Sequence, residues 1–350
     1  MGGVLIAMSG GVDSSVAALI IVEQGMDCAG GIMDLHNDVF RDAGDAQAVA
    51  KELGISFYIF DFAEAFKEQV INRFIRAYQK GETPNPCIDC NRYLKFDYLF
   101  NRAKDLNKDY IATGHYARIE PDATDGRYLL KKGIDRAKDQ SYVLYTMTQE
   151  RLKHTIFPLG GLTKSQVREI AYERGFENAG KHDSQDICFV QNGENYADFI
   201  RQYSGIEIPK GRFIDTNGND LGENKGIIHY TVGQRKGLGL SAAAPLYVCS
   251  VCAGNNTVVV GTADKLYAKA LIAREINLIP IDKLDASIKV HARIRYRQPE
   301  QPATAWQLSP DTLRIEFDSP QRAVTKGQAV VLYYDDTVIG GGTIDEVEAQ

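Results

Sequence analysis

Residues 5–19 read LIAMSGGVDSSVAAL, and this stretch decides the fold of the first part of the chain. The apolar run at 4–8 has the length and composition of a buried parallel strand. Val16, Leu19 and Ile20 then recur at helical spacing, which predicts a helix directly after the polar turn. A buried strand that enters a helix through a glycine-rich turn is typical of a doubly wound α/β domain.

The turn SGGVDSS has the composition of an anion-binding loop. Gly10 and Gly11 permit positive φ angles and leave backbone N–H groups uncovered, and the helix behind them adds the positive end of its dipole. Three serines add hydroxyl donors, and Asp13 could hold a metal ion that bridges phosphate oxygens. No lysine follows the glycines, so the loop is not of the G-x-x-x-x-G-K-[ST] type. A simple tight connection is one interpretation; the full string resembles the pyrophosphate-binding loop of the ATP pyrophosphatases, which adenylate an oxygen and release pyrophosphate.

The length and composition of the chain limit what it can be. At 350 residues it is too long for one typical core, so two or three domains are expected. No apolar run reaches the roughly 18 residues of a membrane span, and no signal peptide precedes the first strand, so we expect a cytoplasmic protein without membrane contact. The net charge of −6 argues against general affinity for nucleic acid, although local basic surfaces can still bind phosphate.

The pattern of the first 200 residues predicts a doubly wound parallel sheet, because strand and helix patterns alternate. The expected strands lie at 4–8, 29–35, 56–62 and 110–116, and the helices between them include 45–53 and 66–78. We assign this α/β catalytic domain, of the ATP pyrophosphatase (adenine nucleotide hydrolase-like) type, to residues 1–204.

The rest of the chain is rich in short β runs broken by Gly, Asn and Pro. Runs at 227–230, 245–251 and 257–260 predict a small β-rich central domain at 205–268. Runs at 289–297, 312–317 and 328–334 predict a C-terminal antiparallel β-barrel at 269–350. Neither internal repeats nor low-complexity tracts interrupt this order.

Six cysteines in a reducing compartment indicate catalysis or metal binding before structural disulfides. The motifs NPCIDCNR (85–92) and SQDICF (184–189) place cysteines in polar loops, and a C-x-x-C pair can be a redox pair, a metal site or a sulfur carrier. A second pair, Cys249 and Cys252, lies in a strand-like run, where the two side chains point to opposite faces. These two and Cys28 are expected to fill the core or a sheet face. No histidine lies at metal-ligand spacing, so we expect no zinc.

Six motifs occur in the order SGGVDSS, TPNPCIDCN followed by KF, ATGHYAR, KDQSYVLY, SQDICF and HYTVGQRKGLG. Together they resemble the tRNA-specific 2-thiouridylases, over nearly the whole chain. The resemblance implies that ATP with Mg²⁺ adenylates O2 of the wobble uridine in the anticodon arm of a tRNA. A cysteine persulfide, charged by a sulfur donor such as a cysteine desulfurase or a sulfur-relay protein, then delivers sulfur to C2, giving 2-thiouridine, AMP and pyrophosphate.

The resemblance also implies roles for individual residues. Cys90 is the nucleophile and Cys188 bears the persulfide, with a disulfide between them after transfer. The residues implied in ATP binding are Ala7, Met8, Ser9, Gly10, Gly11, Val12, Asp13, Ser14, Met33 and Gly114. Those implied at the target base are Asn85, Pro86 and Cys87. Those implied in tRNA binding are His115, Lys138, Asp139, Gln140, Arg295, Tyr296 and Gln328.

One residue departs from the family pattern. The well-studied bacterial branch has Asp where this chain has Cys87, and a thiol that titrates near roughly 8.5 does not simply replace a carboxylate. In the family that Asp contacts the target base and assists proton transfer. Either another group, with Asp89 and Asp139 as candidates, takes this proton here, or Cys87, Cys90 and Cys188 hold an iron–sulfur cluster with one iron open to sulfide.

Two other classes of function compete with this interpretation. An amidotransferase or NAD-synthetase-like enzyme would use the same loop, but it would need an ammonia source and neither Cys90 nor Cys188. A non-catalytic tRNA-binding or zinc-binding protein would leave the SGGVDSS loop unexplained.

Overall fold

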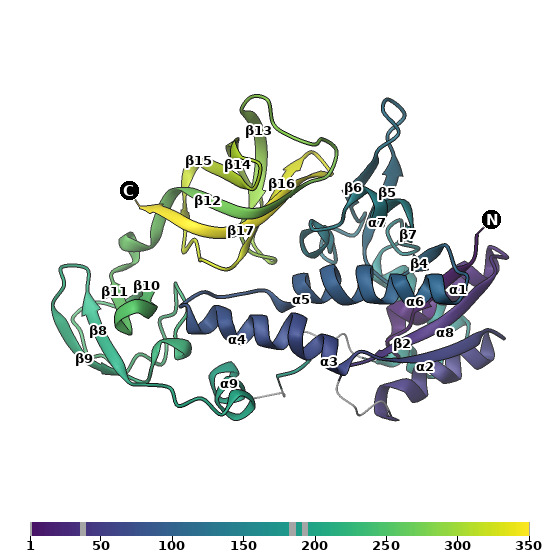
Figure 1. Ribbon diagram of the computed structural model, residues 1–350, viewed down its shortest axis with the longest axis horizontal. Coiled ribbons are helices and arrows are strands. Elements are labelled where there is room, and N and C mark those ends of the chain that lie inside the picture. Colours follow the sequence, from purple (N-terminus) through teal and green to yellow (C-terminus); the bar gives the residue numbers. More distant parts are fainter. Residues whose placement is uncertain (1, 36–39, 182–186, 191–194, 350) are drawn as a thin grey trace. The chain divides into compact units, whose positions relative to one another are not determined.

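The computed structural model describes residues 2–35, 40–181, 187–190 and 195–349 (Figure 1). The chain forms two compact units, and each is described here by itself. The first unit consists of residues 1–70, 87–185 and 334–340, and the second of residues 71–86, 186–333 and 341–350. The domain boundaries expected at 204/205 and 268/269 stay predictions.

The first unit is built on a five-stranded parallel sheet, as the alternating pattern predicted. Its order is β3-β2-β1-β4-β7, with all neighbouring pairs parallel. The strands are β1 (Val4–Ala7), β2 (Cys28–Asp34), β3 (Ser56–Asp61), β4 (Tyr110–Ala112) and β7 (Thr155–Ile156). The expected strand at 110–116 ends early, so residues 113–116 lie beyond the carboxyl end of β4.

Three helices cover one face of this sheet: α1 (Val12–Glu23), α2 (Phe40–Glu52) and α8 (Lys164–Glu173). Val4 and Ile6 of β1 share one hydrophobic cluster with Val16 of α1 and Val167 of α8, and all four side chains are fully buried. Leu5, which points to the opposite face by strand alternation, is buried as well. Burial of each such side chain stabilises the fold by about 1.5–3 kcal/mol. The glycine-rich turn therefore joins a strand and a helix that are both fixed by the core.

The segment with Cys87 and Cys90 is helical, so the prediction of a polar loop was wrong. The segments α5 (Pro86–Asp89), the π-helical η2 (Cys90–Tyr98) and α6 (Leu99–Asp105) follow one another without a break. Pro86 is the first helical residue, where its missing N–H costs no hydrogen bond and its fixed φ favours the helix. The helix expected at 66–78 is longer than predicted and consists of α3 (Ala63–Phe66), the π-helical η1 (Lys67–Ile71) and α4 (Asn72–Gln79).

The remaining elements of the first unit are short. They are β5 (Ala117–Pro121), β6 (Tyr128–Lys132), the 3-10 turn η3 (Ser141–Leu144), α7 (Gln149–Lys153) and the 3-10 turn η4 (Glu177–Gly180). Strands β5 and β6 form an antiparallel hairpin, and Thr337 in the first residues of β17 (Thr337–Ala349) pairs with Lys131 of β6.

The second unit contains a four-stranded sheet in the order β10-β11-β8-β9. The predicted strands at 245–251 and 257–260 are confirmed as β10 (Tyr247–Cys252) and β11 (Thr257–Gly261). Sequence analysis missed β8 (Gly211–Asp215) and β9 (Asp220–Asn224), which enclose an Asn-Gly turn. The strand expected at 227–230 is wrong: this segment is the 3-10 turn η5 (Ile227–His229), preceded by Gly226 at φ +104°.

The C-terminal strands close into an antiparallel barrel, as predicted. Its order is β12-β15-β14-β13-β16-β17, and β17 pairs with β12 to close the ring. Besides β17, the strands are β12 (Tyr267–Leu278), β13 (Ile288–Arg293), β14 (Gln301–Ser309), β15 (Thr312–Arg322) and β16 (Ala329–Tyr334). The second unit also holds α9 (Tyr196–Ser204) and the 3-10 turns η6 (Ala253–Asn255) and η7 (Ala263–Leu266).

Membrane-spanning helices were sought along the described residues. None of the helices there has both the length and the apolar composition that a bilayer crossing requires.

Candidate functional site

The SGGVDSS loop leaves the carboxyl end of β1 and opens toward the start of α1. Gly10 has φ +72°, a conformation that a side chain at this position would strain. The first backbone bond of the helix runs from Ser15 N–H to the carbonyl of Gly11 at 3.2 Å. The N–H groups ahead of Ser15 therefore lie at the open helix end, where the helix itself offers them no acceptor. This arrangement suits an anion.

Side chains hold the loop in this shape. The Ser14 hydroxyl accepts a bond from Ser9 N–H at 3.1 Å and donates one to the Gly11 carbonyl at 3.0 Å. Asn178 of η4, which is buried, donates from Nδ2 to the Gly10 carbonyl at 3.1 Å and to the Ser15 hydroxyl at 2.9 Å. Sequence analysis missed Asn178, because it lies more than 160 residues from the loop and none of the quoted motifs contains it.

Asp13, in the first turn of α1, has two further partners that sequence analysis did not assign. Lys164 Nζ lies 2.7 Å and 2.8 Å from the two carboxylate oxygens of Asp13. Tyr116 donates its hydroxyl to Asp13 Oδ1 at 2.7 Å. The loop that lacks its own lysine therefore receives one from α8.

Gly114 follows β4 and lies against the first turn of α1. A Cβ at this position would come within 2.9 Å of the Asp13 carbonyl carbon and 3.0 Å of Ser14 N. Only glycine lets the two backbone segments approach so closely. Gly114 therefore sets the distance between the end of β4 and the SGGVDSS loop.

The loop lies where the strand order of the sheet reverses, between β1 and β4. In open α/β sheets this edge, at the carboxyl ends of the strands, is the usual place of a ligand. Of the residues predicted to bind ATP, Met8 and Val12 have buried side chains and offer only backbone groups. Met33 is half-buried near the end of β2. The N–H-rich loop, the Asp13 carboxylate and the Lys164 ammonium fit a nucleotide phosphate with Mg²⁺.

Cys87 and Cys90 are three positions apart in the first turns of the helix that begins at Pro86, so they share one helix face. Cys87 is exposed and Cys90 is half-buried. Burial raises the pKa of the Cys90 thiol; the Lys95 ammonium opposes this, and Cys87 and Asp89 add to it. The surrounding protein also raises the pKa of Cys87 by desolvation, again against Lys95.

The Lys95 ammonium also shifts the pKa of a buried histidine, His115. His115 is buried between the rings of Phe96 and Phe157, at 5.9 Å and 5.7 Å between centroids. Burial lowers the pKa of His115 well below its ordinary value, and Lys95 lowers it further. The Thr113 hydroxyl lies 2.7 Å from His115 Nδ1. His115 is therefore a neutral, interior imidazole, and its predicted contact with tRNA stays a prediction.

Cys188 belongs to the second unit, and its side chain is exposed. The next residue, Phe189, is buried against Phe74 and Phe199, each at 5.2 Å between ring centroids. The thiol is thus presented to solvent beside an anchored aromatic ring. Ser184, Gln185 and Asp186 of the SQDICF motif lie outside the described residues.

Asn85 is half-buried and Pro86 is buried. Both lie at the end of residues 71–86, a segment of the second unit that is bonded to the barrel through Thr83. Gln328 donates from Nε2 to the Thr83 carbonyl at 2.7 Å, and Thr83 N–H bonds to the Lys326 carbonyl at 2.8 Å. Gln328 is therefore a positioning residue for the TPNP segment, whatever else it contacts.

Two of the residues predicted to bind tRNA near Lys138 have internal roles. Asp139 is buried and accepts bonds from Gly133 N–H at 3.1 Å and from the Ser141 hydroxyl at 2.9 Å. Gln140 accepts from Tyr116 N–H at 2.9 Å. Lys138 itself is half-buried in the same turn.

Arg295 and Tyr296 follow β13, which ends at Arg293, so the strand expected at 289–297 is shorter than predicted. Arg295 donates from Nη2 to the Ala323 carbonyl at 2.8 Å and to the Thr325 hydroxyl at 2.9 Å. Tyr296 is 36% exposed. Of this pair, the tyrosine is the better placed for an external contact.

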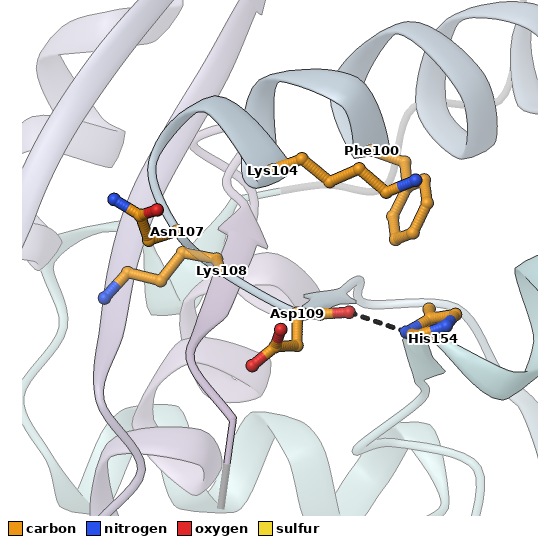
Figure 2. A pocket seen from close by; sticks show the side chains of 6 residues that line it. All are labelled: Phe100, Lys104, Asn107, Lys108, Asp109 and His154. Carbon is orange, nitrogen blue, oxygen red and sulfur yellow. Dashed lines mark hydrogen bonds between the residues drawn. The ribbon is translucent and has the colours of Figure 1, made fainter.

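Figure 2 shows a pocket of the first unit that is not the nucleotide edge. It lies before β4, near the amino ends of the strands, and His154 Nδ1 lies 2.9 Å from the Asp109 carbonyl in it. Its lining residues are Phe100, Lys104, Asn107, Lys108, Asp109 and His154. A nucleotide bound at the SGGVDSS loop would occupy the opposite edge of the sheet.

Metal sites were also sought among the described residues. No group of three or more His, Cys, Asp or Glu side chains there is arranged to hold a metal ion.

Cys249 and Cys252 of β10 are half-buried, and the strand register shifts between Val248 and Ser250, so the simple alternation expected for this pair is interrupted at Cys249. Cys28, at the start of β2, is half-buried as well.

Comparison with known proteins identifies the family. Residues 2–192 match the tRNA methyl transferase HUP domain, residues 197–262 the tRNA methyl transferase PRC-barrel domain, and residues 268–344 the aminomethyltransferase beta-barrel domain. The tRNA-specific 2-thiouridylase MnmA of Clostridioides difficile is 48% identical over 354 residues, covering 98% of each chain. MnmA of Acetivibrio thermocellus is 49% identical, covering 97% of this chain and 98% of the relative. This chain therefore belongs to the tRNA-specific 2-thiouridylase family.

Proposed function

We propose that this protein is a tRNA 2-thiouridylase, a tRNA sulfurtransferase that replaces O2 of the wobble uridine by sulfur at the expense of ATP. The observation that carries the proposal is the occurrence, in one unit, of an anion-binding loop at the sheet edge and of a cysteine-bearing helix. Full-length similarity to curated 2-thiouridylases supports the same activity.

The first step is adenylation. The uridine O2 attacks the α-phosphorus of ATP, the bond to the β-phosphate oxygen breaks, and pyrophosphate leaves. N–H groups of the SGGVDSS loop bind the departing phosphates, and the loop serines add donors. Asp13 would hold Mg²⁺, which would neutralise charge on the pyrophosphate. Adenylation converts O2, a poor leaving group, into AMP.

The second step is sulfur transfer. The terminal sulfur of a Cys188 persulfide attacks C2 and AMP leaves, which gives a C2–S–S–Cys188 intermediate. The Cys90 thiolate then attacks Cys188 Sγ and breaks the S–S bond, so that 2-thiouridine departs and a Cys90–Cys188 disulfide remains. A thiol reductant restores both thiols before a sulfur donor, such as a cysteine desulfurase or a relay protein, charges Cys188 again. The target base must be extruded from its stack to reach these groups.

In the family pattern, an Asp at the position of Cys87 assists proton transfer at the target base. In this chain another group must accept that proton. Asp139 is buried and already accepts several bonds, so it is poorly placed for this task. Asp89 is half-buried on the same helical turn as Cys90 and is the better candidate. Sulfide delivery from an iron–sulfur cluster on Cys87, Cys90 and Cys188 is the competing route to the same product.

One set of assays tests this function. Protein purified without oxygen is analysed for iron and acid-labile sulfide, then mixed with ATP, an undermodified tRNA with a wobble uridine, and a persulfide donor. We expect AMP, pyrophosphate and 2-thiouridine in equal amounts, without bound iron. Three or four iron atoms per chain, with thiolation from sulfide alone, would establish the cluster route. ATP turnover that requires ammonia instead of tRNA would indicate an amidotransferase, and tRNA binding without any ATP turnover a non-catalytic protein.

A further inference from the structure

Residues 80–85 connect α4 to α5 and form neither a helix nor a strand. Asn85, at the end of this connection, and Pro86, directly after it, are the residues predicted to contact the target base. A segment without a backbone ladder of its own takes its course from the groups to which its N–H and carbonyl groups bond. At Thr83 those groups belong to the barrel, in the turn at 325–328 between β15 and β16.

The turn at 325–328 bonds to both backbone groups of Thr83. Thr83 N–H donates to the Lys326 carbonyl at 2.8 Å, and Gln328 donates from Nε2 to the Thr83 carbonyl at 2.7 Å. The turn is itself fixed within the barrel, because Gly327 N–H donates to the Ile344 carbonyl and Ile344 N–H donates to the Gln328 carbonyl, each at 2.8 Å. Ile344 is buried in β17. Thr83 is therefore attached to a rigid part of the barrel.

Gly327 brings this turn into backbone contact with the connection. It has φ +84°, in the left-handed region that favours glycine. A Cβ at Gly327 would lie 2.8 Å from the Cβ of Glu82 and 2.9 Å from Thr83 N. These distances are shorter than a real Cβ contact allows, so a side chain here would push the connection away by a few tenths of an ångström. The absence of a side chain at Gly327 thus sets how closely the barrel and Thr83 approach.

We propose that Gly327 and Gln328 are positioning residues for the target base. Through Thr83, they fix Asn85 and Pro86 in the place where the wobble uridine binds. This inference rests on the proposed 2-thiouridylase function, and it gives the barrel a part in the rate of the reaction as well as in tRNA binding. A residue that only binds tRNA changes the affinity, whereas a residue that positions the base changes the rate at saturating tRNA.

The first-turnover rate of pyrophosphate release, at saturating ATP and tRNA, measures base positioning without a sulfur donor. Filter binding gives the tRNA affinity separately. A misplacement of about 1 Å can lower a rate about 100-fold, so we expect the smaller shift in Gly327→Ala to lower it about tenfold, with unchanged tRNA affinity. Gln328→Leu loses one bond to Thr83 and should also lower this rate about tenfold, whatever its effect on affinity.

Gly218→Ala is the matched control. Gly218 has φ +88°, close to that of Gly327, and lies in the turn between β8 and β9, where a Cβ would meet nothing within 4 Å. This variant carries the same kind of backbone strain without the contact, so it should keep the wild-type rate. Thermal unfolding shows that each variant is folded. If Gly327→Ala does not fold, the rate of Gln328→Leu at saturating tRNA still decides the matter.

A wild-type rate in either Gly327→Ala or Gln328→Leu would overturn the assignment for that residue, and a loss in Gln328→Leu confined to affinity would leave Gln328 a tRNA contact only. An equal loss of rate in Gly218→Ala would also overturn the assignment, because strain alone would then explain the effect. In each of these cases the proposed function would stand. Failure of the wild type to release pyrophosphate with tRNA would overturn the proposed function, and the assignment with it.

Discussion

Asp13 draws its partners from two distant parts of the chain. Lys164 and Tyr116, which are 151 and 103 positions away, both bond to its carboxylate. If this carboxylate also holds Mg²⁺ on the pyrophosphate, Asp13→Ala should lower tRNA-dependent pyrophosphate release at least about 100-fold. A coupled pyrophosphate assay measures the rate, and circular dichroism checks the fold. Release of ADP and phosphate by the wild type would contradict the adenylation step itself.

The environment of Cys90 determines when its thiol can react. Burial raises the pKa of the Cys90 thiol above that of an ordinary cysteine, which is about 8.5. The reactive thiolate of Cys90 therefore forms at a higher pH than that of an ordinary cysteine. The Lys95 ammonium favours the thiolate, so Lys95→Met should shift the pH dependence of Cys90 alkylation further upward. Alkylation rates between pH 6 and 10, followed by mass spectrometry in a background that lacks Cys87, measure both curves. Lys104→Met, at an exposed position of α6, is the control. A downward shift in Lys95→Met would show that the electrostatic argument is wrong.

We expect serine substitutions of Cys87, Cys90 and Cys188 to affect the reaction differently. Cys188→Ser should stop thiolation but permit adenylation, because the ATP site does not use that thiol. Cys90→Ser should also stop turnover, because the intermediate is then not resolved. Cys87→Ser should retain most activity on the persulfide route and lose it on the cluster route. Quantification of 2-thiouridine and AMP distinguishes the cases, and a Cys188→Ser enzyme that still makes thiouridine would refute the persulfide assignment.

At the scale of elements, β4 and α1 approach each other through Gly114. A methyl group there would contact the Asp13 backbone at 2.9 Å, and backbone cannot move aside as a flexible side chain can. Gly114→Ala should therefore destabilise the protein by about 1–3 kcal/mol and weaken ATP binding. Gly161→Ala is the control, since a Cβ at Gly161 meets nothing within 4 Å. Urea unfolding and calorimetry measure the two effects; equal behaviour of the two variants would mean that the loop tolerates a shift.

The elements of the sheet could be predicted because each carries a local pattern. Apolar runs predicted four of the five parallel strands, and the glycine-rich turn lies, as predicted, between β1 and α1. The helix that bears Cys87 and Cys90 could not be predicted in the same way. Its proline was taken as a loop signal, although proline also suits the first turn of a helix. The π-helical turns from Cys90 to Tyr98 change the spacing on which helical periodicity depends.

At the scale of the whole molecule, the two compact units are not contiguous in sequence. Residues 334–340, which run from the last residue of β16 into β17, belong to the first unit, where Asp336 lies in an ion pair with Arg118. Residues 71–86 belong to the second, where Gln328 holds Thr83. Such contacts join segments more than 200 residues apart, and local patterns carry no information about them. For the same reason Asn178 and Lys164 were absent from the predicted site, and a deletion after residue 268 would damage both units.

Point variants in each unit therefore test how tRNA binds. If Lys138, in the first unit, contacts a phosphate, Lys138→Ala should weaken tRNA binding and reduce the slope of log Kd against log salt by about 1. If Tyr296, in the second unit, stacks on a base, Tyr296→Ala should lower affinity by roughly 1–3 kcal/mol and leave the slope unchanged. If the two residues contact the RNA independently, the double variant should show the sum of the two losses. Filter binding at four salt concentrations measures these values, with Lys153→Ala, an exposed lysine at the end of α7, as the control. An unchanged salt slope in Lys138→Ala, or full affinity in Tyr296→Ala, would remove that residue from the tRNA interface.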